Sequence, residues 1–316
     1  MKDSPILWIV VPCYNEEAML PLSMPRLETL VERMVSEGLI DHDSRIVYVD
    51  DCSRDSTWSI IREAHARKAL HSGLHLGLNA GQQNAMIAGL EASAGRADCV
   101  VTIDADLQDD ISVIPDMVRH YCEGYDIVYG VRSDRSTDSW FKRSTGLGFY
   151  RLMGWLGART VYNHSEFRLV SSRAIAQLSQ YGERSIFLRS IVTQLGYPST
   201  TVTYERQRRE AGETKYSLGR MLALALTGIT SVTVKPIRLI SIFGLLFLLV
   251  AVGVGVWVVW SMSVGRNVPG WVSLMLSMWF IGGCLLAALG VIGEYIGNMY
   301  LDVKQRPRYN ITEECL

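Results

Sequence analysis

Charged residues are almost absent from one part of this 316-residue chain. Between Leu239 and Gly293, Arg266 is the single charged residue in 55 positions, whereas the other 261 residues carry the remaining 62 of 63 charges. About 24% of the residues outside that stretch are therefore charged, which is ordinary for a globular protein. The composition indicates a soluble part of roughly 235 residues joined to a membrane segment, and it excludes intrinsic disorder and a collagen-like protein.

The chain also lacks an excess of basic residues and any cysteine pattern. Its 31 Lys and Arg residues balance 32 Asp and Glu residues, so it has no electrostatic footprint for nucleic acid. Its six cysteines form no C-x-x-C pair and have no histidine at zinc spacing, which favours reduced cytosolic thiols over a zinc site or a disulfide framework. We expect no signal peptide, because the apolar run Ile6–Val11 is too short to be one.

Two uncharged stretches, Leu239–Trp260 and Trp271–Gly293, are long enough to cross a membrane. At about 1.5 Å per residue, a helix over either stretch spans a ~30 Å hydrocarbon core. The alternative is a buried core helix of a soluble protein, and two such runs in succession disfavour it. We therefore predict a two-span transmembrane hairpin with a short cytoplasmic tail over residues 237–316.

Basic residues flank this hairpin on its outer sides, three before it and three after it: Arg220, Lys235, Arg238, Lys304, Arg306 and Arg308. The link between the spans contains Arg266 alone. The positive-inside rule then places both termini and the large domain, residues 1–216, in the cytoplasm at the inner membrane. Residues 217–236 are apolar but shorter and more polar than a span, so we predict an interfacial helix there.

The first ~130 residues alternate short apolar runs with amphipathic stretches, a pattern typical of a mostly parallel sheet with helices on both faces. The expected strands are Leu7–Val11, Ile46–Val49, Leu74–Leu76, Cys99–Ile103 and Ile127–Tyr129. The expected helices are Glu16–Ser36, Thr57–Lys68, Gly81–Ala92 and Val113–Cys122. In such α/β folds, ligands bind beyond the carboxyl ends of the strands.

Polar residues gather at three of these strand ends, beginning at Pro12, Asp50 and Asp104. Asp104 and Asp106 are two residues apart, and Gln108 continues the same alternation if the chain stays extended. Carboxylate and amide oxygens suit Mg²⁺ or Mn²⁺ at a diphosphate, and they do not suit zinc. One such acid is usually a turn former or a helix cap, but three adjacent groups at one sheet edge predict a binding site.

Eight motifs run in order along almost the whole chain: V-P-C-Y-N-E-E, V-D-D-C-S-R-D-S-T, N-A-G-Q-Q-N-A-M-I-A-G-L, D-A-D-L-Q-D, Y-G-V-R, E-F-R-L, R-E-A-G-E-T-K-Y and G-E-Y-I-G. With them the chain resembles the family 2 glycosyltransferases of GT-A fold. It is most similar to the polyprenyl-phosphate glycosyltransferases, which include bactoprenol glucosyltransferases and dolichol-phosphate mannose synthases. Two positions depart from the family pattern, because Cys52 replaces the usual Gly and Glu166 replaces an Asp common in bacterial members.

The resemblance implies a nucleotide-sugar pocket lined by four residues, of which the last reads the base: Pro12, Tyr14, Glu16 and Asp50. It further implies that Asp104 contacts the nucleotide or the metal, and that Asp106 and Gln108 hold the metal. A divalent ion there would stabilise the negative charge of the leaving diphosphate. We interpret Asp51 and Asp55 as helix-cap or turn residues.

The resemblance also places five basic residues near the acceptor phosphate: Arg132, Lys142, Arg143, Arg209 and Lys215. A lipid phosphate is mostly a dianion at pH 7 and is already nucleophilic, so it needs cations more than a base. The expected catalytic groups are Asp104, Asp106, Glu166 and Arg168. Glu166 is a candidate base or positioning carboxylate, and it is equally a candidate structural partner of Arg168.

The expected reaction is inverting transfer of a sugar from a nucleotide-sugar to polyprenyl phosphate, with UDP-glucose and undecaprenyl phosphate as the default substrates of bacterial members. The alternatives are a catalytically silent nucleotide-sugar-binding subunit and a processive polysaccharide synthase. The second would carry a Q-x-x-R-W motif and more spans, which the sequence does not have. The resemblance also suggests a homotetramer.

Overall fold

A computed structural model of the chain describes residues 4–133, 164–182, 188–205, 235–264 and 270–316. Eight strands form one sheet in the order β7-β5-β6-β4-β1-β2-β3-β8. The strands are β1 (Leu7–Cys13), β2 (Arg45–Asp50), β3 (His71–Leu76), β4 (Cys99–Thr102), β5 (Ile127–Arg132), β6 (His164–Ser171), β7 (Ser199–Tyr204) and β8 (Ile311–Cys315). All five strands expected from the sequence are present, and β6, β7 and β8 were not expected.

The sheet is mostly parallel, as predicted. Parallel pairs join β1 to β2 and β4, β2 to β3, and β5 to β7. Two strands run the other way: β6 is antiparallel to β4 and β5, and β8 is antiparallel to β3. The carboxyl ends of β1, β2, β3 and β4 consequently share one edge, which we call the carboxyl edge.

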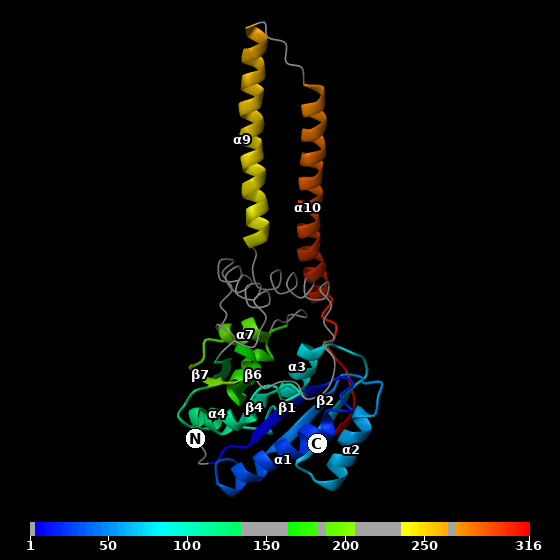
Figure 1. The fold of residues 1–316 in the computed structure, drawn as a ribbon, viewed down its shortest axis with the longest axis vertical. Coiled ribbons are helices and arrows are strands. Elements are labelled where there is room, and N and C mark those ends of the chain that lie inside the picture. The colour runs from blue at the N-terminus through cyan, green and yellow to red at the C-terminus, as the bar shows by residue number, and fades with distance from the viewer. Residues whose placement is uncertain (1–3, 134–163, 183–187, 206–234, 265–269) are drawn as a thin grey trace.

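Helices cover both faces of the sheet (Figure 1). One face buries apolar residues of α1 (Leu20–Ser36), α2 (Thr57–Arg67) and α4 (Ile114–Cys122). The other face buries apolar residues of α3 (Gln82–Ala92), α6 (Ser172–Leu178) and α7 (Leu188–Gln194). Each large apolar side chain so buried contributes roughly 1.5–3 kcal/mol, and this two-sided core fixes the loops at the carboxyl edge.

Gly89 lies where α3 packs closely on the sheet. A Cβ at this position would lie 2.4 Å from Val10 Cγ1 and 3.1 Å from Val49 Cγ2, and both valines are fully buried. We expect Gly89→Ala to lower the free energy of unfolding by about 1–3 kcal/mol, because overpacking outweighs the better helix propensity of alanine. Chemical denaturation of the purified chain measures the change. Gly182→Ala is the matched control, since a Cβ there has no neighbour within 4 Å. Equal stability of the two variants would contradict the close packing.

Two long helices, α9 (Lys235–Ser263) and α10 (Trp271–Val303), project from one side of the sheet domain and run beside each other (Figure 1). The rings of Phe247 and Phe280 approach to 5.9 Å between them. Both predicted spans are therefore helical. Among the described residues, however, length and hydropathy identify one candidate membrane span, Phe280–Val303, and α9 contributes the shorter apolar stretch Leu239–Val254. Of the predicted interfacial helix, residues 217–234 lie outside the described residues, and α9 already begins at Lys235.

The chain after α10 returns to the sheet, a pairing that the sequence did not predict. Strand β8 pairs with β3, and Gly77 N donates to Asn310 O at 2.9 Å just beyond the carboxyl end of β3. Ahead of β8, Arg308 and Tyr309 both contact the Glu91 carboxylate of α3. The end of α10 is thereby tied to the carboxyl edge.

Candidate active site

The loops after β1 and β2 are bound to each other at the carboxyl edge. Cys13 and Asp50 are register partners, and Asp51 N donates to Cys13 O at 2.9 Å. Asn15 N donates to Ser53 Oγ, also at 2.9 Å. The first two polar groups predicted from the sequence therefore form one continuous surface.

Three of the four predicted donor-pocket residues belong to the β1 end of this surface. Pro12 is buried in β1, Tyr14 is 37% exposed, and Glu16 is half-buried. The backbone N–H of Glu16 donates to Thr57 Oγ1, which ties the loop to the start of α2. Tyr14 is thus an aromatic ring at the surface of the edge, the position from which a ring can stack on a nucleobase.

Asp50, the fourth donor-pocket residue, is fully buried. Its Oδ2 lies 2.6 Å from His75 Nδ1, and its Oδ1 accepts a hydrogen bond from Ser53 N at 3.3 Å. The His75 ring stacks on Trp58 of α2, with 5.1 Å between the centroids. The Asp50 carboxylate is therefore held from two sides, and its role in reading the base stays a prediction.

Asp51 and Asp55 are structural, as predicted. The Asp51 carboxylate accepts hydrogen bonds from Ala80 N and Gly81 N at the start of α3. The Asp55 carboxylate accepts from Thr57 N at the start of α2, and from Glu17 N. Each acid satisfies backbone N–H groups at a helix N-terminus, where the helix dipole also favours negative charge.

The loop after β4 carries the acids of the D-A-D motif, and its chain does not stay extended, which was the condition for Gln108 to continue their alternation. Leu107 adopts a positive φ of 45°, and Leu107 N donates to Asp104 O, which closes a turn. Even so, Ala105 and Leu107 are buried whereas Asp104, Asp106 and Gln108 are half-buried. The three predicted metal ligands therefore share the accessible side of a turn.

Asp104 is the most strongly perturbed carboxyl of this loop. Burial first of all, and then the nearby charges of Asp109, Asp106 and Glu166, raise its pKa to about 7 against the lowering effect of Arg189. Asp104 Oδ1 accepts from Gln82 Nε2, at the first turn of α3, at 2.7 Å. A crowded set of acids with hard oxygen ligands fits a divalent cation, which would relieve the repulsion among them.

A second acidic group does not belong to this site. Among the residues that the structure describes, the His and acidic side chains whose ligand atoms lie within 4.8 Å of one another are Asp41, His42 and Asp43. They precede β2 at its amino end, on the side of the sheet opposite the carboxyl edge. Asp104 and Asp106, two of the predicted metal ligands, belong to no such group within the described part of the chain.

Glu166 and Arg168, on β6, form the other side of the site. Arg168 NH2 contacts Glu166 Oε2, and Arg189 Nε of α7 donates to Glu166 Oε1 at 2.7 Å. Glu166 and Arg168 are buried, whereas the Arg189 side chain is 36% exposed. Both carboxylate oxygens of Glu166 are therefore bound by guanidinium groups, an arrangement that suits a positioning carboxylate and not a base.

Arg132, at the end of β5, is held by two neighbours. Its NH2 lies 3.5 Å from Asp109 Oδ1, and its Nε donates to Tyr204 Oη at 3.3 Å. The Tyr204 hydroxyl in turn donates to Asp109 Oδ1 at 2.5 Å. The other four predicted acceptor residues, Lys142, Arg143, Arg209 and Lys215, lie outside the described residues.

The strand order separates these groups. The predicted donor-pocket residues lie at the carboxyl ends of β1 and β2 on one side of β4, and Arg132 and Arg168 belong to β5 and β6 on its other side. The acid loop after β4 lies between the two sets. The order along the edge is therefore the predicted donor pocket, the acid loop, and then Arg132 and Arg168. This order suits a donor bound on one side of the acids and an anionic acceptor bound on the other.

Three contributors to this site had no distinct signal in the sequence: His75, Arg189 and Tyr204. Each is a residue type that is common on protein surfaces and in cores, and each acts through a partner far away in the chain. Gln82 belongs to one of the eight sequence motifs, but its contact with Asp104 becomes visible only in the fold.

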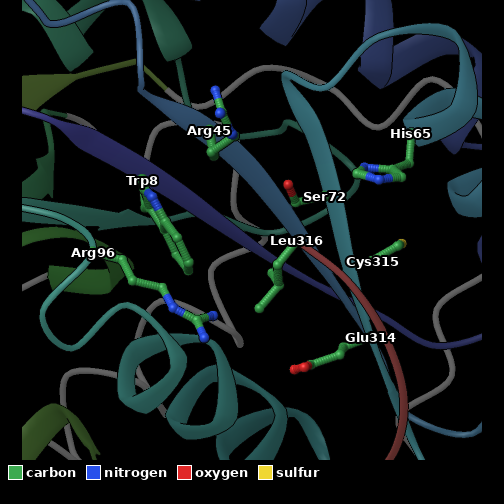
Figure 2. A pocket seen from close by; sticks show the side chains of 8 residues that line it. All are labelled: Trp8, Arg45, His65, Ser72, Arg96, Glu314, Cys315 and Leu316. Atoms are coloured by element: carbon green, nitrogen blue, oxygen red, sulfur yellow. The ribbon is translucent and has the colours of Figure 1, made fainter.

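A cavity of about 630 Å³, lined by Trp8, Arg45 and Arg96 among others, lies at the amino ends of the strands, away from the predicted site (Figure 2).

Comparison with known proteins identifies the family. Residues 8–194 match the description of glycosyl transferase family 2. The chain belongs to this family. It is a glycosyltransferase.

The glycosyltransferase has relatives that match it over almost its whole length. It is 48% identical to the uncharacterized glycosyltransferase YkoT of Bacillus subtilis, over 98% of this chain and 93% of the relative. It is 36% identical to the prophage bactoprenol glucosyl transferase homolog of Escherichia coli, over 96% and 97%. It is also 36% identical to the bactoprenol glucosyl transferase of Shigella phage SfV, over 97% and 98%. The sequence resemblance to this family is thereby confirmed.

The glycosyltransferase accommodates its two departures from the family pattern. Cys52, in place of the usual Gly, has a φ of 58°, a left-handed conformation that glycine adopts most easily. Its thiol lies 3.8 Å from Gly77 O, so the side chain has a place between the loops after β2 and β3. Glu166, in place of Asp, reaches both Arg168 and Arg189.

Proposed function

We propose that the protein transfers a sugar from a nucleotide-sugar to a polyprenyl phosphate at the membrane surface, with inversion at the anomeric carbon. UDP-glucose and undecaprenyl phosphate are the substrates we expect. The observation that carries this proposal concerns one edge of the sheet. The acid loop, Arg132 and Arg168 lie at the carboxyl edge, and the chain that follows α10 pairs with β3 at the same edge. The names of the bactoprenol glucosyl transferases among its relatives support the same acceptor class.

The position of β8 supports a site that faces the membrane. Strand β8 begins at Ile311 beside Leu76, at the carboxyl end of β3, and α10 ends at Val303. Eight residues of chain span at most roughly 30 Å. The carboxyl edge therefore lies within that reach of the apolar helix, as transfer to a lipid phosphate requires.

The donor end of the reaction uses the β1, β2 and β4 loops. Pro12, Tyr14, Glu16 and Asp50 are the proposed nucleotide residues. Asp104, Asp106 and Gln108 would hold Mg²⁺ or Mn²⁺. When bound, such an ion stabilises the charge that develops on the leaving diphosphate. A diphosphate bound at the acid loop would lie between the proposed nucleotide residues and Arg132, so that its anomeric carbon would face the acceptor side.

At the acceptor end, a phosphate oxygen attacks the anomeric carbon while the bond from that carbon to the diphosphate oxygen breaks. No proton has to be removed, because the phosphate monoester is mostly a dianion at pH 7. Arg132 on β5 would hold that dianion, and Glu166 keeps buried Arg168 in place behind the site. Lys142, Arg143, Arg209 and Lys215 are the further basic residues that we propose for the acceptor. In-line attack inverts the configuration, so an α-linked donor yields a β-linked product.

The decisive experiment offers the purified full chain a panel of nucleotide-sugars with undecaprenyl phosphate and identifies the lipid product by mass spectrometry. A hexosyl undecaprenyl phosphate from UDP-glucose is the expected result. A chain that binds nucleotide-sugars but forms no lipid-linked sugar would be a silent binding subunit, and a polymeric product would show a processive synthase.

We further propose that α9 and α10 form a two-span hairpin in the inner membrane with both termini cytoplasmic, and that the chain forms homo-oligomers. Six basic residues lie before or after the two spans, and one lies in the link between them, so the positive-inside rule favours cytoplasmic termini. A cysteine at position 267, introduced as Asn267→Cys in a Cys284→Ser background, should react with an impermeant thiol reagent applied to intact cells. The same background without the new cysteine should stay unlabelled. Labelling of that background would place cysteines of the sheet domain outside the cell and would contradict this orientation.

A further inference from the structure

Arg189 is a half-exposed cation on the β6 side of the site, and its side chain and neighbouring backbone are held by several contacts. Its Nε donates to Glu166 Oε1 at 2.7 Å, and the second oxygen of that buried carboxylate is bound by Arg168. The backbone N–H and C=O of the neighbouring residue Leu188 are both hydrogen-bonded to side chains. Leu188 N donates to Gln83 Oε1, and Leu188 O accepts from Arg168 NH1. The base of the Arg189 side chain is therefore pre-organised by two elements that also carry site residues, α3 and β6.

The charge of Arg189 is placed among the groups of the site. It lowers the pKa of Asp104 against the stronger effects of burial and neighbouring acids, and it opposes protonation of Arg132 and Arg168 as a like charge. Arg189 therefore lies close enough to the acid loop and to the other two arginines to act on each of them. Arg189 binds Glu166 through Nε, and a guanidinium is the side-chain group whose planar fork of donors best matches a phosphate.

We propose that Arg189 is a phosphate-binding residue for the acceptor, held in position by Glu166. This inference rests on the proposed function. The acceptor is favoured over the donor diphosphate because Arg189 contacts β6, on the side of β4 away from the β1 and β2 loops. The half-exposed guanidinium supplies a site that a phosphate monoester can reach, whereas buried Arg168 supports it from behind.

Two variants test the role of Arg189, and one controls for the loss of an arginine. Arg189→Ala should weaken binding of undecaprenyl phosphate in detergent micelles about 10- to 150-fold, the effect of one charge-assisted hydrogen bond to phosphate. Arg189→Lys, which keeps the charge but not the fork, should recover part of that loss. Arg173→Ala is the control, because Arg173 pairs with Asp126 at the amino end of β5, away from the site.

The readout combines native mass spectrometry of undecaprenyl phosphate binding with steady-state kinetics for both substrates. We expect a raised apparent KM for undecaprenyl phosphate with little change in KM for UDP-glucose. Equal lipid binding by the wild type and Arg189→Ala overturns the inference, and so does a rise confined to the KM for UDP-glucose. A wild-type chain that binds undecaprenyl phosphate but transfers no sugar overturns the proposed function instead, while the difference between the variants still decides the role of Arg189.

Discussion

Removal of divalent ions should abolish transfer, and Asp106→Ala should lower kcat by roughly 10²–10³-fold or more, the size of effect expected when charge stabilisation at a reacting group is lost. EDTA should stop the reaction, and added Mn²⁺ or Mg²⁺ should restore it. The physical reason lies in the acid loop. Asp104 has a pKa raised to about 7 by burial and by three neighbouring acids, so the loop gains when a cation occupies it.

The fold of the Asp106→Ala variant should stay intact, because Asp106 is half-buried on a turn and its loss removes repulsion from Asp104. Asp116→Ala is the matched control. Asp116 is an exposed acid on α4 that pairs with Arg119, and its loss should leave kcat unchanged. Turnover is measured with radiolabelled donor at several metal concentrations. Full activity in excess EDTA would remove the metal from this reaction and leave Asp106 without its assigned role.

The parallel core of the sheet was predictable because its strands are short apolar runs that end in turn formers. β1 and β2 are buried almost throughout, and strands buried on both faces are recognisable in the sequence as continuous apolar runs. Their order along the chain also predicted that the groups at Pro12 and Asp50 share one edge. The register pair Cys13–Asp50 confirms this, because parallel neighbours bring their carboxyl ends together.

β6 was not predictable by the same means, since it contains Glu166 and Arg168 in its buried interior. Charges in the middle of a strand contradict an apolar pattern, and although Glu166 was a candidate partner of Arg168, the sequence did not show that the pair is buried in a strand. β8 could not be predicted from the sequence for a different reason. Its sequence I-T-E-E-C is polar because it is an edge strand, and its partner β3 lies more than 230 residues earlier in the chain.

The candidate site divides in the same way. Asp51 and Asp55 accept hydrogen bonds from backbone N–H groups beside the starts of α3 and α2, which agrees with their interpretation as cap or turn residues. Arg189 was missed because its partner Glu166 is on another element and no local pattern links them. The condition set for Gln108, an extended chain, is not met, because Leu107 adopts a left-handed conformation that the sequence pattern did not indicate.

The role of Glu166 gives the second large expected effect. If the acceptor dianion is its own nucleophile, Glu166→Gln should reduce kcat/KM for polyprenyl phosphate about 10- to 150-fold, because it weakens the hold on the arginines without removing a base. An obligatory base would instead make the loss complete. The two oxygens of Glu166 are engaged by Arg168 and Arg189, which favours the first outcome.

A conservative variant separates positioning from simple structural damage. Glu166→Asp restores the residue common in bacterial members of the family, and it should retain most of the activity because the carboxylate is kept. Glu166→Gln leaves buried Arg168 without its ionic partner, so its stability is measured in parallel. The double variant Glu166→Gln/Arg189→Ala should lose less than the product of the two single losses, since both changes act on one phosphate contact. Fully multiplicative losses in well-folded variants would show that Glu166 acts independently of Arg189.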